Sequence, residues 1–211
     1  MSIAINDRVL ADLGPTSGAA LWAKRAALVA GGIAALAVAA KISVPMWPSP
    51  VPITMGTFAV LTIGAAYGMR LGLVTILGYM LIGALGYDVF ASSSSSVNGL
   101  AYMMGGTGGF LAGYVLAVML LGALARRGWD KSVVKMGAAM LLGNVVIYAL
   151  GVPWLYTLVD GGLFNAAQFA TAWDQTLAWG VTPYMIGDAL KLGLAALLLP
   201  LAWKLVGKAR T

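Results

Sequence analysis

The chain has 211 residues, of which 61% are hydrophobic and only 9% are charged, and its mean hydropathy is +0.90. Soluble domains carry about 25% charged residues, so this composition predicts an all-α integral membrane protein with one compact bundle. The lack of Cys and His excludes disulfide scaffolds, thiol nucleophiles and Cys/His metal sites. All seven acidic residues are Asp, which leaves metalloproteases and acid/base hydrolases poorly supported. The net charge of +6 is typical of membrane topology here rather than of nucleic-acid binding.

Six apolar segments separated by polar or proline- and glycine-containing connections predict six transmembrane helices. The polar stretch before Trp22 lacks the apolar segment of a signal peptide, so we interpret residues 1–22 as a cytoplasmic extension. Residues 23–211 then form a single membrane domain. The predicted spans are residues 26–41, 54–69, 72–87, 110–125, 136–152 and 182–203.

Three connections have unusual compositions. Four prolines in residues 44–52 exclude a helix there and predict a stiff, extended loop. The serine run at residues 92–96 is interpreted as a flexible connector. The glycine cluster at residues 105–109 either permits close helix packing or presents backbone N–H groups to a ligand, and it lacks the spacing and Lys of a phosphate-binding loop.

The connection before the last span is long and rich in tryptophan. Pro153 is expected to end the fifth span. Residues 154–181 are interpreted as a partly helical loop that lies at the membrane interface, with Trp154, Trp173 and Trp179 as anchors.

The distribution of basic residues predicts the topology. With six spans, eleven of the thirteen Lys and Arg residues fall on the side of both termini. The positive-inside rule therefore places both termini of this multi-pass membrane protein in the cytoplasm. Lys41 and Lys191 are the exceptions. The eleven residues are Arg8, Lys24, Arg25, Arg70, Arg126, Arg127, Lys131, Lys135, Lys204, Lys208 and Arg210.

Two charged residues, Asp188 and Lys191, lie inside the last apolar segment. At a rise of about 1.5 Å per residue, Asp188 is roughly 9 Å and Lys191 roughly 14 Å below Thr182, and the spacing places both on one helix face. Each charge costs about 2.5–3.5 kcal/mol in a bilayer, so both are expected to face the protein interior. The pair either neutralises itself as an internal ion pair or binds a ligand that offers a carboxylate and N–H groups.

Two further features are candidate contact sites. Asn144 and Tyr148 lie one turn apart on one face of the fifth span, where Asn serves either a helix–helix hydrogen bond or a ligand. A stripe of small residues on the first span either packs inside the bundle or docks another subunit. The stripe consists of Ala27, Gly31, Ala35 and Ala39.

Four motifs, at residues 51–60, 105–114, 143–154 and 187–191, occur in the order found in a known family. Over residues 44–204 the chain resembles the BioY family, the biotin-specific S components of energy-coupling factor (ECF) vitamin transporters. The resemblance implies the S-component fold with six helices and both termini cytoplasmic, in the bacterial cytoplasmic membrane. It also implies high-affinity capture of biotin from outside, with the first external loop as a lid.

The resemblance assigns Asp188 to a ureido N–H of biotin and Lys191 to its carboxylate, with the reverse assignment left open. Gly56, Gly106 and Ile186 depart from the family pattern, where Gln, Pro and Pro are common; the change at Gly56 affects a lid contact. The other candidate pocket residues are Thr54, Thr107, Tyr114, Asn144 and Tyr148.

The resemblance also implies partners. The small-residue stripe is similar to the surface that docks on a transmembrane coupling subunit (T component), which contacts two cytoplasmic ATPases. The chain has no Walker A motif, so the energy would come from these partners. No cofactor is expected, because biotin is the cargo. The chain could also associate with copies of itself as a homo-oligomer. The alternative functions are a stand-alone carrier of another small carboxylated vitamin, an intramembrane enzyme, and a small channel or proton-coupled carrier.

Overall fold

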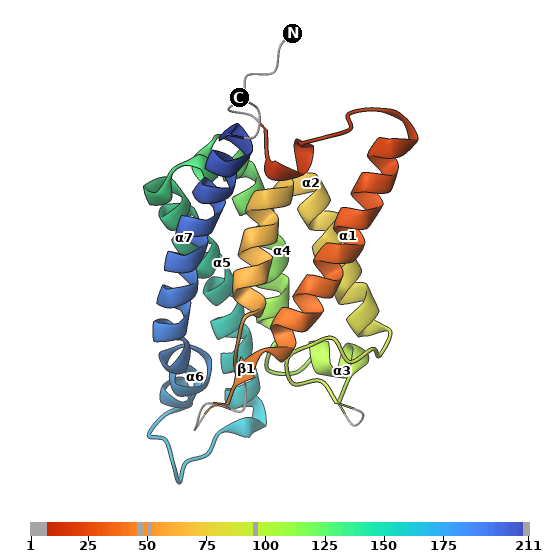
Figure 1. Cartoon of the computed structure of the whole chain (residues 1–211). Coiled ribbons are helices and arrows are strands. Elements are labelled where there is room, and N and C mark those ends of the chain that lie inside the picture. The colour runs from red at the N-terminus through yellow and green to blue at the C-terminus, as the bar shows by residue number, and fades with distance from the viewer. Residues whose placement is uncertain (1–7, 46–48, 50–51, 95–96, 209–211) are drawn as a thin grey trace.

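The protein is an all-helical bundle with one two-residue β-ribbon (Figure 1). The computed structural model describes residues 8–45, 49, 52–94 and 97–208. In chain order the elements are η2 (Leu10–Asp12), α1 (Gly18–Lys41), β1 (Ser43–Val44), β2 (Ile53–Thr54), α2 (Gly56–Ala84), α3 (Gly99–Met103), α4 (Gly108–Arg126), η3 (Trp129–Lys131), α5 (Val133–Leu158), η4 (Val159–Leu163), α6 (Ala172–Gly180), η5 (Thr182–Tyr184) and α7 (Met185–Lys208).

The long helices run roughly along one axis. The start of α1 and the end of α7 lie at one end of the bundle, and the β-ribbon, α3 and α6 lie at the other (Figure 1). We call these the terminal end and the loop end. Five helical segments of the described chain are long and apolar enough to cross a membrane.

Helix α2 covers the second and third predicted spans and reverses direction at Gly68. This residue has φ +74° and ψ 172°, which lie outside the helical region and suit glycine. A Cβ placed on Gly72 would lie 3.6 Å from the Cα of Gly64, whereas eight residues of continuous helix would separate these positions by roughly 12 Å. The two arms therefore pack antiparallel, as Figure 1 shows, and the turn occurs before Arg70 rather than after it.

Helix α1 begins at Gly18, eight residues before the predicted span. The Nζ of Lys24 donates hydrogen bonds to the carbonyl oxygens of Leu13 (3.1 Å) and Pro15 (3.2 Å), which ties the segment before the helix to its first turns. The first membrane helix therefore begins inside residues 1–22, and the division of the chain at residue 22 stays a prediction.

Helix α5 also runs further than predicted, because it passes through Pro153 and ends at Leu158. Proline removes one backbone donor and need not end a helix whose neighbours hold it in place. The helix is held there by the indole Nε1 of Trp154, which donates to the carbonyl oxygen of Gly105 at 2.9 Å, and by the close packing of Gly151 on Phe110.

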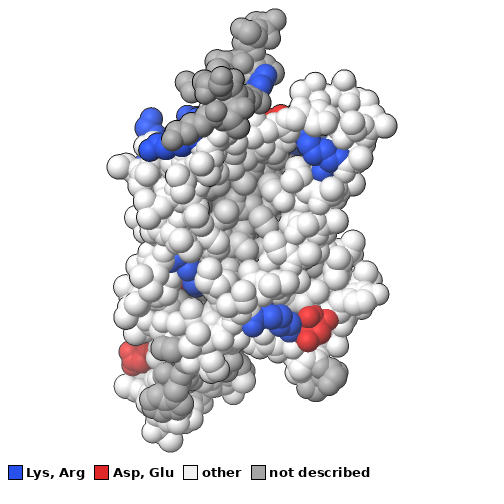
Figure 2. Space-filling model, in the orientation of Figure 1, with Lys and Arg blue, Asp and Glu red and all other residues white. Residues whose placement is uncertain are grey.

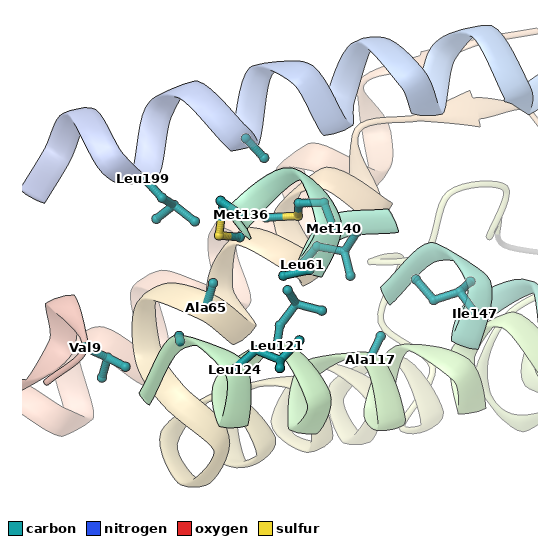
Figure 3. Close-up of a cluster of buried hydrophobic side chains, with 13 residues drawn as sticks. Val9, Leu61, Ala65, Ala117, Leu121, Leu124, Met136, Met140, Ile147 and Leu199 are labelled. Carbon is teal, nitrogen blue, oxygen red and sulfur yellow. The ribbon is translucent and has the colours of Figure 1, made fainter. Parts of the chain in front are cut away.

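A buried apolar cluster fills the terminal half of the bundle, between α2, α4, α5 and α7 (Figure 3). Val9 is fully buried at one end of this cluster. The ion pair between Arg126 and Asp12 (3.2 Å) holds the segment that carries Val9 against α4. Residues 8–12 therefore complete the core rather than extend from it. The members of the cluster are Val9, Leu61, Ala65, Ala117, Leu121, Leu124, Ala125, Met136, Ala139, Met140, Ile147, Ala195 and Leu199.

The connections at the loop end are ordered by backbone pairing and side-chain bonds. The two ends of the proline-containing loop pair antiparallel, with Ser43 opposite Thr54. The residues between them at 46–48 and 50–51 lie outside the described part of the chain, so the expected stiffness there stays a prediction. In the serine run Ser93 is buried and its hydroxyl bonds the backbone of Phe90, which corrects the interpretation of that part as a flexible connector.

Basic side chains gather at the terminal end of the molecule, as Figure 2 shows. This arrangement follows from the connectivity, because the basic residues flank the start of α1, the reversal of α2, the loop between α4 and α5, and the end of α7. Arg210 lies outside the described residues. Lys41 and Lys191 lie elsewhere: Lys41 pairs with Asp88 at the loop end, and Lys191 is on α7 inside the bundle.

Candidate functional site

The two charged residues of α7 form a buried ion pair. The Nζ of Lys191 lies 2.9 Å from Oδ1 of Asp188, and each side chain is only 10% exposed. The hydroxyl of Tyr148 on α5 donates to Oδ2 of the same carboxylate at 2.5 Å. Both oxygens of Asp188 are therefore occupied from two helices, which offsets part of the cost of burying its charge.

This pair lies on the wall of a cavity in the loop half of the bundle. The cavity volume is about 100 Å³, whereas a single water needs roughly 10–15 Å³, so the space suits a small molecule. All seven residues predicted as pocket contacts line this one cavity, although they come from four separate elements and the connection before α4. They are Thr54 (β2), Thr107 (before α4), Tyr114 (α4), Asn144 and Tyr148 (α5), and Asp188 and Lys191 (α7).

Asn144 is the clearest candidate for a ligand contact on α5. Its Oδ1 is buried and has no hydrogen-bond partner among the described residues. Most buried polar groups in proteins are hydrogen-bonded, so an unpaired amide oxygen on a cavity wall is an acceptor available to a bound molecule. Among the described residues, this oxygen accepts no helix–helix hydrogen bond, which was the alternative interpretation.

The remainder of the wall is largely aromatic, and the sequence reasoning missed it. Phe110 contacts Tyr148 edge-to-face with ring centroids 6.2 Å apart, and Phe90 stacks on Tyr102 at 4.9 Å. Aromatic residues at helical spacing usually signal ordinary packing, so the sequence offered no clear signal for this role. The aromatic residues on the wall outside the predicted set are Tyr79, Phe90, Tyr102, Phe110, Trp179 and Tyr184.

Phe90 reaches the cavity because its loop is fixed to α1. Lys41 donates to Oδ1 of Asp88 at 2.6 Å, and the hydroxyl of Ser93 donates to the same oxygen at 2.5 Å. The hydrogen bond from Lys41 is the main cause that lowers the pKa of Asp88, with Ser93 acting in the same direction. An exposed ion pair contributes little stability, but this one joins the loop that carries Phe90 to the end of α1.

The glycine cluster before α4 serves close packing and also lines the cavity. A Cβ on Gly109 would lie 2.3 Å from Cβ of Trp154, and one on Gly108 would overlap the carbonyl oxygen of Met103. Gly106 and Thr107 meanwhile form part of the cavity wall. Close packing is therefore confirmed for Gly108 and Gly109, whereas the presentation of backbone N–H groups to a ligand stays a prediction.

Comparison with known proteins identifies the family. A sequence profile of the family described as BioY matches residues 11–208. This chain belongs to the BioY family. Its BioY relatives include a probable biotin transporter from Pyrococcus horikoshii, 34% identical over 83% of this chain and 94% of the relative. The biotin transporter of Thermotoga maritima is 31% identical over 81% of this chain and 92% of the relative. The biotin transporter of Rhizobium etli is 33% identical over 82% of this chain and 87% of the relative.

The fold agrees with this family. A crystal structure of the S-component for biotin from an ECF-type ABC transporter superposes with a TM-score of 0.72, covering 90% of this chain and 95% of that chain. The two sequences are 18% identical, so the likeness establishes a shared S-component fold.

At Gly56, a tyrosine hydroxyl lies next to the space that a side chain would occupy. A Cβ on Gly56 would lie 3.6 Å from the Oη of Tyr114 and 3.1 Å from Oγ1 of Thr54. A long side chain at this position would therefore compete with Tyr114 for the cavity wall.

The small-residue stripe of α1 faces outward. Ala27, Gly31 and Ala35 are exposed, and a Cβ on Gly31 would meet no atom within 4 Å. Ala39 is half-buried and packs against the core, so it belongs only partly to this surface. The inward face of α1 is a different one, formed by Gly32, Leu36 and Ala40. Packing inside the bundle therefore does not explain the first three members of the stripe.

Proposed function

We propose that this chain is the biotin-binding membrane subunit of an uptake system and captures biotin from outside the cytoplasmic membrane. The observation that supports this most strongly is a cavity whose wall carries the buried Asp188–Lys191 ion pair and the five other polar residues expected at the site. The names of the BioY relatives and the likeness to a biotin S-component support the same ligand. Biotin is the cargo here and not a cofactor.

The geometry of the pair favours a shared contact with one polar end of biotin. Because Nζ of Lys191 and Oδ1 of Asp188 lie only 2.9 Å apart, we propose that both contact the same polar end of biotin, in place of the division between ureido and carboxylate that the resemblance implied. The ureido group offers N–H donors next to a carbonyl acceptor. In our proposal the carboxylate of Asp188 accepts a ureido N–H, Lys191 donates to the ureido oxygen, and Asn144 accepts the second N–H.

The proposed topology has six transmembrane helices, counting the two arms of α2 separately, with both termini in the cytoplasm. The gathering of basic residues at the terminal end supports this orientation, because positively charged loops remain inside. The cavity then lies in the half of the bundle that faces outside, beneath the β-ribbon and α6.

Binding of biotin to the purified protein tests the proposal. Detergent-solubilised wild-type protein is expected to bind biotin saturably with one site per chain, measured by isothermal titration calorimetry. Competition by other small carboxylated vitamins is the control for the alternative cargo. Saturable binding of another vitamin with no response to biotin would contradict the proposal.

We further propose that Ala27, Gly31 and Ala35 form the docking surface for a transmembrane coupling subunit, through which two cytoplasmic ATPases supply energy. A second copy of this chain is the alternative partner. Exposed small residues let another helix backbone approach closely, and the three lie along one exposed face of α1.

Ala35→Leu is expected to weaken association with the coupling subunit by about tenfold or more, because a larger side chain overfills a close helix contact. Co-purification from membranes measures the effect, and biotin binding should be unchanged. Ala112→Leu, at an exposed position on α4, is the matched control and should leave association intact. Equal association of both variants would mean that the partner docks elsewhere.

A further inference from the structure

Trp179, at the C-terminal end of α6, lines the cavity with an unused hydrogen-bond donor. Its indole Nε1 is buried and has no partner among the described residues. By contrast, Nε1 of Trp154 donates to the carbonyl oxygen of Gly105, and Nε1 of Trp203 donates to Asp130. A buried donor left unpaired costs free energy, so its retention on a cavity wall points to a ligand acceptor.

Neighbouring contacts fix Trp179 in place. The hydroxyl of Ser49 donates to its carbonyl oxygen at 2.7 Å, and its ring meets that of Phe169 edge-to-face with centroids 6.5 Å apart. The next residue, Gly180, packs on Leu155 and Phe110, since its Cβ would lie 2.8 Å and 3.5 Å from their side chains. An interface anchor, as the sequence suggested, would instead expose its N–H.

These contacts place Trp179 at the far end of the cavity from the ion pair. Asn144 and Leu155 both line the cavity on α5, and three turns of helix separate them by roughly 16 Å. Asn144 lies with the charged pair, whereas Leu155 packs beside Trp179 through Gly180. The cavity is therefore elongated, with polar groups at both ends.

The chemistry of this far end suits an anion. Gly106 and Thr107, at the N-terminus of α4, lie on the wall there, and Phe110 in the first turn of α4 contacts Gly180. The N-terminal end of a helix carries a partial positive charge, which adds to the donor of Trp179.

We propose that the indole N–H of Trp179 donates a hydrogen bond to the carboxylate of biotin while its ureido end meets Asp188 and Lys191. This inference rests on the proposed function, because it assigns the second polar end of the same ligand.

The test compares biotin with its methyl ester, which has no carboxylate charge. Trp179→Phe removes the N–H and keeps an aromatic ring. It is expected to weaken biotin binding about tenfold and to change binding of the ester much less. Trp173→Phe, on the exposed side of the same helix, is the matched control and should bind both ligands as the wild type does.

The outcomes separate this proposal from the one on which it rests. Wild-type protein that binds no biotin would overturn the proposed function itself. Biotin binding that is unchanged in Trp179→Phe, or that weakens equally for biotin and ester, would overturn the role of the N–H alone. If the Phe variant is not recovered folded by gel filtration, Trp179→Leu is compared in the same way, and only a loss selective for biotin supports the proposal.

Discussion

Lys191→Ala is expected to lower the affinity for biotin by at least roughly 100-fold, the equivalent of about 3 kcal/mol. The substitution removes the proposed donor to the ureido oxygen. It also leaves the carboxylate of Asp188, which is 10% exposed, without its positive partner. Titration calorimetry measures the affinity, and thermal unfolding in detergent should show a loss of stability as well, because removal of one member of a buried ion pair leaves an uncompensated charge.

A double variant separates ligand binding from ion pairing. Asp188→Asn combined with Lys191→Met removes both charges at similar side-chain volume, and replacement of a whole buried pair is often neutral or stabilising. We expect this variant to unfold at or above the wild-type temperature and to bind biotin as weakly as Lys191→Ala does. Wild-type affinity in the double variant would show that the pair is only an internal ion pair.

The sequence could predict that Asp188 and Lys191 face the interior of the bundle, because charges are rare inside a bilayer. Asp188 and Lys191 stand out in an apolar segment, and their spacing alone places them on one face. The positions of the long helices followed from composition in the same way. The hydrogen bond from Tyr148 to Asp188 could not be predicted in this way, because the two residues are forty positions apart and the local sequence carries no signal for their contact.

Local rules failed where tertiary contacts replaced a local preference. Pro153 usually marks a helix end, but the bond from Trp154 to Gly105 holds the next turn of α5 in place. Val9 belongs to a polar stretch, yet it is fully buried because the reversal at Gly68 leaves a space that it fills: a Cβ on Gly68 would lie 3.3 Å from its side chain. Neither contact can be read from the nearby sequence.

Trp179 shows a similar limit within the site. Tryptophan in a connection between spans is typical of the membrane interface, so the sequence favoured an anchor. Its place on the cavity wall depends on the packing of Gly180 against α4 and α5. The sequence therefore predicted polar residues that line the cavity, whereas the aromatic part of the wall required the structure.

Gly113→Ala is expected to destabilise the bundle by about 1–3 kcal/mol and to weaken biotin binding, because it forces α4 away from α5. A Cβ on Gly113 would lie 2.8 Å from the Cα of Ile147 and 3.0 Å from its carbonyl oxygen. Backbone atoms cannot move aside as a flexible side chain can. The displaced helices carry Tyr114 on one side and Asn144 and Tyr148 on the other, so the cavity wall shifts with them.

Gly137→Ala is the matched control for this prediction, since Gly137 is also a helical glycine. Its Cβ would meet only the Cβ of Ala196, at an ordinary contact distance of 3.8 Å. Alanine favours a helix over glycine by up to about 1 kcal/mol, so this variant should unfold at or slightly above the wild-type temperature and bind biotin normally. Thermal unfolding in detergent and calorimetry on both variants measure the contrast. Equal stability of Gly113→Ala and Gly137→Ala would show that α4 and α5 can separate without a loss of stability. The close contact at Gly113 would then not determine the width of the cavity.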